Sequence, residues 1–93
     1  MLKKYSVMVE GKNIHLNRGQ MGFFTTRRVE AISKREAEEI AIELIKQELE
    51  TLGVLCNSIG DPPTFVIEKV DEVDSFGDFV TPGKGFTLFP EGH

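Results

Sequence analysis

The sequence predicts an α+β domain of element order β-β-α-β-β, in which one long helix packs across one face of a single antiparallel-rich sheet. Three observations carry this prediction. Stretches with strand-like patterns lie on both sides of one helical stretch, that stretch has start and stop signals, and 93 residues suffice for only one core. We therefore assign residues 1–90 to one domain and interpret Glu91-Gly92-His93 as the remnant of a purification tag.

The N-terminal part predicts two strands joined by a loop. Residues 3–10, KKYSVMVE, place Tyr5, Val7 and Val9 on one face, which is the period of a half-buried strand. Residues 22–32, GFFTTRRVEAI, are rich in the aromatic and β-branched residues that strands favour. Turn-forming residues are frequent in between, so we expect residues 11–21 to form a long hairpin loop. The pattern leaves open whether residues 14–16 add a short strand.

The helix is predicted from Ser33 to Gly53. Ser33 and Glu36 have the spacing of a capping box, in which the serine oxygen accepts a hydrogen bond from the backbone three residues later. Gly53 suits the left-handed cap that commonly ends helices. Apolar residues recur between these signals at steps of three and four, which predicts one buried stripe. They are Ala37, Ile40, Ala41, Leu44, Ile45, Leu49 and Leu52.

Two further strands follow the helix. Residues 64–73, TFVIEKVDEV, form the third, and a slip in their apolar alternation indicates either a bulge near Lys69 or the end of the strand there. Residues 86–89 form a short fourth strand before Pro90. The polar, glycine-bearing stretch 74–85 between them is expected to be a loop.

The charges are unevenly distributed along the chain. Residues 1–35 hold eight basic and two acidic side chains, whereas residues 36–93 hold three basic and thirteen acidic ones, giving a net charge of −4. A basic half can mark a nucleic-acid surface, but in so short a chain we expect the halves to pair internally. We expect a cytoplasmic protein without a membrane span, because there is no long apolar run or signal-like start. The lone Cys56 predicts neither a disulfide nor a metal site, and we expect no cofactor.

The Gly83-Lys84-Gly85 stretch resembles part of a phosphate-binding loop but lacks its pattern. A loop of the GxxxxGK[ST] type needs glycine where Asp78 stands and serine or threonine where Gly85 stands. Such a loop also opens a helix, whereas a strand pattern follows here. We interpret the stretch as a turn in which both glycines permit positive φ.

Arg27 and Arg28 are candidates for binding a small phosphate-bearing ligand together with Lys84. Adjacent strand residues point to opposite faces, so at most one of these two guanidinium groups lies under the helix. Arg28 on the other face has the geometry to hold a phosphate or carboxylate bidentately. The alternative is a cross-strand ion pair of Arg28 with Glu68 or Glu10.

The phenylalanines carry the preferred functional hypothesis. All seven lie outside the predicted helix: Phe23, Phe24, Phe65, Phe76, Phe79, Phe86 and Phe89. Phe23 and Phe24 must project from opposite faces of one strand, and one helix covers only one face. The aromatic surface left over predicts a partner. We expect a non-enzymatic interaction module that forms a homodimer, or binds another protein, through Phe24, Phe86 and Phe89.

Residues 22–31, GFFTTRRVEA, and 83–90, GKGFTLFP, resemble segments of small uncharacterised bacterial proteins of similar length, a resemblance that implies no particular activity. The order of elements also resembles small antitoxins with a partial ribonuclease-H-like or double-stranded-RNA-binding-like sheet. That resemblance implies a second hypothesis, a regulatory protein that binds nucleic acid or a toxin through the basic N-terminal hairpin. Such antitoxins usually add a DNA-binding segment, and this chain has no stretch left over for one.

Overall fold

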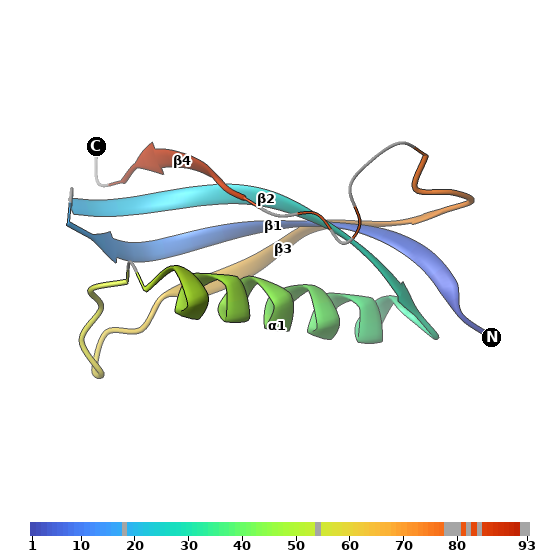
Figure 1. Ribbon diagram of the computed structural model, residues 1–93, viewed down its shortest axis with the longest axis horizontal. Coiled ribbons are helices and arrows are strands. Elements are labelled where there is room, and N and C mark those ends of the chain that lie inside the picture. Colours follow the sequence, from blue (N-terminus) through green and yellow to red (C-terminus); the bar gives the residue numbers. More distant parts are fainter. Residues whose placement is uncertain (18, 54, 78–80, 82, 84, 92–93) are drawn as a thin grey trace.

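The computed structural model describes residues 1–17, 19–53, 55–77, 81, 83 and 85–91. They form a four-stranded antiparallel sheet with one helix packed along it, which confirms the predicted α+β fold (Figure 1). The elements are β1 (Lys3–Leu16), β2 (Gly19–Ala31), α1 (Lys34–Leu52), β3 (Thr64–Val73) and β4 (Thr87–Pro90). The strand order is β3-β1-β2-β4, so β3 and β4 lie at opposite edges of the sheet.

The prediction that residues 11–21 form a long hairpin loop is wrong. β1 and β2 continue almost to their connection, where His15 pairs with Gln20 and Leu16 with Gly19. An irregularity between Gly11 and Ile14, where Asn13 has a φ of 59°, absorbs the polar residues that resembled a loop. Residues 14–16 therefore belong to β1 itself and are not a separate strand.

Both caps of α1 confirm the sequence signals. The Ser33 hydroxyl accepts a hydrogen bond of 3.2 Å from the Glu36 backbone, and the Glu36 carboxylate accepts one from the Ile32 backbone. Gly53 ends the helix with a φ of 64° and donates its N–H to the last turn. The buried stripe is narrower than predicted and has steps of four residues. It comprises Ala37, Ala41, Ile45 and Leu49.

β3 carries the predicted bulge. Met8 of β1 pairs with Lys69 and Val9 pairs with Ile67, so Glu68 is the extra residue. β4 pairs with the stretch of β2 from Met21 to Phe24. The connection between β3 and β4 thus carries the chain from one edge of the sheet to the other.

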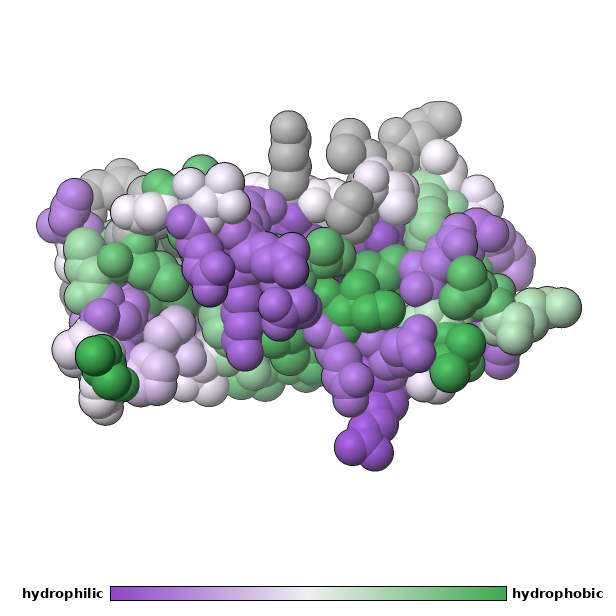
Figure 2. All heavy atoms as spheres, turned by 60° about the horizontal axis from the view of Figure 1, so that its bottom comes forward, coloured by the Kyte–Doolittle hydropathy of each residue, from purple (hydrophilic) through white to green (hydrophobic). Residues whose placement is uncertain are grey.

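The core lies between α1 and the face of the sheet that α1 covers. Phe23 is fully buried there, and its ring lies over Gly11, the residue opposite it on β1, where a Cβ atom would overlap the ring. The buried strand residues on this face are Tyr5, Val7, Val9, Ile14, Phe23, Thr25, Arg27, Val29 and Ala31. Hydrophilic side chains cover much of the α1 side of the molecule (Figure 2). No helix in the described part of the chain is long and apolar enough to cross a membrane.

Candidate functional site

The face of the sheet opposite α1 carries an apolar strip. Strand alternation places Met8, Phe24, Val66 and Phe89 on this face, and we call these four residues the open-face strip. Phe24 and Met8 are 41% and 40% exposed. The ring of Phe89 packs against Phe24 at 5.3 Å and lies over Gly22, where a Cβ atom would come within 2.6 Å of it. Four strands thus contribute to one aromatic and aliphatic surface, and no described helix covers it.

Charged side chains of both signs surround the strip. The strand register puts Arg28, Ser6 and Asp71 in one row across β2, β1 and β3. The next row contains Thr26, Met8 and Lys69. The open face therefore carries basic and acidic groups on the same strands, and on β3 Lys69 and Asp71 form an ion pair of 3.5 Å.

Two carboxyl groups lie together on the open face. The hydrogen bond between Glu10 and Glu68, with desolvation and the Glu68 charge, raises the pKa of Glu10 above its ordinary value of 4.5, while Lys12 opposes this shift. The bulge at Glu68 brings about this approach, since Glu10 itself pairs with Val66. The contact between the two carboxyl groups is favourable when Glu10 is protonated and repulsive when both groups are ionised.

Glu10→Gln is expected to make the protein less sensitive to pH. A raised pKa in the folded state means that this pair contributes stability below the unfolded pKa and loses it as the pH rises through the folded pKa. Melting temperatures should therefore favour Glu10→Gln over wild type increasingly between about pH 4 and about pH 7. A constant difference across that range would contradict the prediction, and Glu43→Gln on the exposed side of α1 is the control.

Arg27 lies under the helix and is only 1% exposed. Its guanidinium forms an ion pair of 3.0 Å with Glu48 of α1 and donates to the backbone carbonyls of Gly83 and Gly85. Its charge lies 5.3 Å from the ring of Phe86. Arg27 thus joins the sheet, the helix and the chain segment that leads into β4.

The structure places Arg27 and Arg28, two of the three predicted phosphate-binding residues, on opposite faces of the sheet. Arg28 is on the open face, as the alternation rule requires, so it cannot share a ligand with Arg27. The register places Arg28 opposite Ser6, and it is half-buried with an interaction of its own. Lys84 lies outside the described residues. Gly83 and Gly85 have φ values of 91° and 85°, which agrees with the predicted turn.

The basic residues of the hairpin are dispersed as well. Arg27 is buried with Glu48, and Lys3 contacts Glu72 at 3.9 Å, so the two oppositely charged halves of the sequence pair with each other in both places. Lys4 lies on the open face beside Glu30. The described basic side chains therefore do not form one continuous surface of the kind that nucleic acids require.

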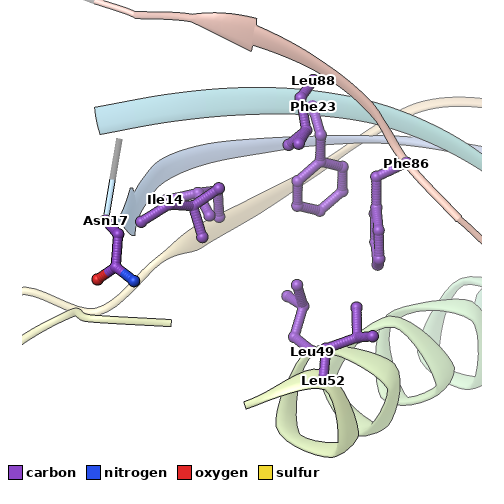
Figure 3. Close-up of a pocket in the computed structure, with 8 residues that line it drawn as sticks. Ile14, Asn17, Phe23, Leu49, Leu52, Phe86 and Leu88 are labelled. Atoms are coloured by element: carbon purple, nitrogen blue, oxygen red, sulfur yellow. The ribbon is translucent and has the colours of Figure 1, made fainter. Parts of the chain in front are cut away.

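Phe86, the third residue predicted for the interface, lies on the α1 side of the sheet. Its half-buried ring packs edge-on against Phe23 at 4.7 Å. Both rings line an apolar pocket of about 440 Å³ between the C-terminal end of α1, β4 and the hairpin end of the sheet (Figure 3). The other lining residues are Ile14, Leu16, Asn17, Leu49, Leu52 and Leu88.

Comparison of the chain with protein-family models, with curated proteins and with solved structures finds no significant match to any of them.

Three residues of these sites could not be identified from the sequence, because their signals in it are too weak. Glu48 is one of many acidic residues on the outside of the predicted stripe, and its pairing with Arg27 depends on how α1 lies across the sheet. Val66 joins the open face through the register of β3. Leu88 reaches the pocket because β4 pairs with β2, which the order of elements does not specify.

Proposed function

We propose that the protein is a non-enzymatic interaction module that forms a homodimer through the open face of its sheet. The observation that carries the proposal is the exposed open-face strip, in which Phe24 and Phe89 pack together on a surface without a covering helix among the described residues. Large apolar side chains gathered on one face of a small domain are typical of an interface.

The register of the sheet allows the open face to pack against a second copy of itself. A two-fold axis parallel to β1, between two facing copies, places β2 of one copy over β3 of the other. The register then sets Met8 over its own counterpart and Phe24 over Val66. The same operation sets Arg28 over Asp71 on both sides of the axis, while Glu10 and Lys4 of β1 each face their own counterpart.

The edges of the sheet support pairing by the face. β3 has a bulge at Glu68 and carries Lys69, Asp71 and Glu72, and both features discourage the addition of another strand. β4 is only four residues long and ends in Pro90, which has no N–H to donate. Addition of a strand from a second copy is therefore disfavoured along β3 and along β4.

Phe24→Ser is expected to weaken the dimer about tenfold or more, because it removes the largest exposed ring of the strip. Sedimentation equilibrium over a range of concentrations measures the dissociation constant. Ile59→Ser is the matched control, since Ile59 is fully exposed in a loop between α1 and β3. A wild-type protein that stays monomeric at high concentration, or a Phe24→Ser variant that dimerises as tightly as wild type, would rule the proposal out.

A charge exchange tests the orientation of the two copies. Arg28→Asp and Asp71→Arg should each weaken the dimer because each places like charges opposite one another. The double variant restores opposite charges in both contacts between positions 28 and 71 and should recover most of the affinity. Failure of the double variant to recover, with circular dichroism unchanged, would reject the axis along β1.

A further inference from the structure

We propose that the pocket between α1 and β4 binds a small neutral molecule with an apolar body and one hydrogen-bond acceptor. At about 440 Å³ the pocket lies within the range of roughly 300–1,000 Å³ that small-ligand sites occupy. It lies on the opposite side of the sheet from the open-face strip, so this inference is independent of the proposed dimer.

The inner wall of the pocket is formed by the folded core. Ile14, Phe23 and Leu49 are at most 4% exposed, and each belongs to a different element of the fold. Figure 3 shows their side chains facing a common space together with the ring of Phe86. A wall held by packing in this way is already formed before a ligand arrives, which lowers the ordering cost of binding.

The mouth of the pocket lies beside two exposed leucines. Leu52 ends α1 and is 54% exposed, and Leu88 on β4 is 39% exposed. Both leucine side chains are in contact with solvent, whereas the residues of the inner wall are buried. A ligand that entered between them would remove both leucines and the inner wall from water, which favours an apolar body.

The described residues that line the pocket carry no charge, which disfavours a charged ligand. Asn17 is the sole polar side chain among the described residues that line the pocket, and none of these described residues is charged. A carboxylate buried against them would have no cation among them to pair with. The Asn17 side-chain oxygen accepts a hydrogen bond from the Cys56 thiol at 3.3 Å, and its amide N–H groups make no hydrogen bond within the described part of the chain. Those N–H groups suit a ligand carbonyl.

Binding is tested with phenylnaphthylamine, a neutral dye whose fluorescence rises in apolar surroundings. We expect saturable binding of one dye per chain, and Leu88→Gln should weaken it about tenfold by making the mouth polar. Phe24→Ser on the open face is the matched control and should change dye affinity less than about twofold, because the two sites are separate. Circular dichroism and melting curves verify that each variant is folded.

Competition identifies the chemistry of the ligand. Methyl heptyl ketone should displace the dye at concentrations at least about tenfold lower than octanoate, because only the octanoate is charged. Asn17→Leu should reduce ketone affinity about fivefold while leaving dye affinity unchanged. Absence of saturable binding, dye affinity unaffected by Leu88→Gln, or equal displacement by ketone and octanoate would each overturn the proposal. Loss of dye binding in Phe24→Ser alone would place the dye on the open face and would also overturn it.

Discussion

Replacing Arg27 by methionine is expected to remove about 3–5 kcal/mol from the free energy of unfolding. Methionine fills much of the same space, but the Glu48 carboxylate then loses its ion pair and the carbonyls of Gly83 and Gly85 each lose a donor. Small domains have a total stability of only about 5–15 kcal/mol, so a substantial part of it would be lost. Urea unfolding followed by circular dichroism measures the change.

A double variant separates the effect of the broken ion pair from the other effects of Arg27→Met on the free energy of unfolding. Arg27→Met combined with Glu48→Leu removes both charges, and it should be more stable than Arg27→Met alone because no unpaired carboxylate remains. Equal stability of the two variants, or a loss below about 1 kcal/mol for Arg27→Met, would show that the guanidinium does not anchor this junction.

Gly11→Ala is expected to cost about 3 kcal/mol, an unusually large effect for the addition of one methyl group. The new Cβ atom would overlap the ring of Phe23. That ring is fully buried between Phe65 and Phe86, with centroid distances of 6.2 and 4.7 Å, so it has little space to move. Thermal and urea unfolding both report the loss.

Replacing Phe23 by a smaller residue tests whether its ring causes the cost of Gly11→Ala. Gly11→Ala should cost less in a Phe23→Leu background, where the smaller side chain leaves room for the methyl group, and the difference is the coupling energy of the two positions. Gly60→Ala provides a control, because a Cβ atom at Gly60 meets no other atom within 4 Å. Equal costs of Gly11→Ala in both backgrounds would show that the ring is not the cause.

Local signals predicted α1 and β3 closely. The Ser33 cap, the Gly53 cap and the bulge in β3 each depend on interactions within a few residues or on one strand period, and a sequence displays those directly. The opposite placement of Phe23 and Phe24 was predictable for the same reason, because strand alternation needs no knowledge of the partner strand.

Long-range geometry determined what the sequence could not predict. The hairpin extends past Gly11 because an irregularity at Asn13 keeps polar residues within the sheet, and only the pairing with β2 reveals it. Phe86 faces the core because β4 pairs Thr87 with Phe24 on the open face, which directs the preceding residue to the α1 side. The pairing of Glu48 with Arg27 depends on the crossing of α1 over the sheet, which spacing along the chain does not specify.

The strand order also sets the course of folding during translation. β1 and β2 are the central strands of the sheet, whereas both flanking strands, β3 and β4, are encoded after α1. A ribosome that has released residues 1–53 therefore presents a hairpin and helix with two unpaired edges and an uncovered Phe23. Unpaired edges of this kind are where nascent chains associate wrongly and where chaperones bind. The edge of β2 from Met21 to Phe24 is paired only when the final strand, β4, arrives.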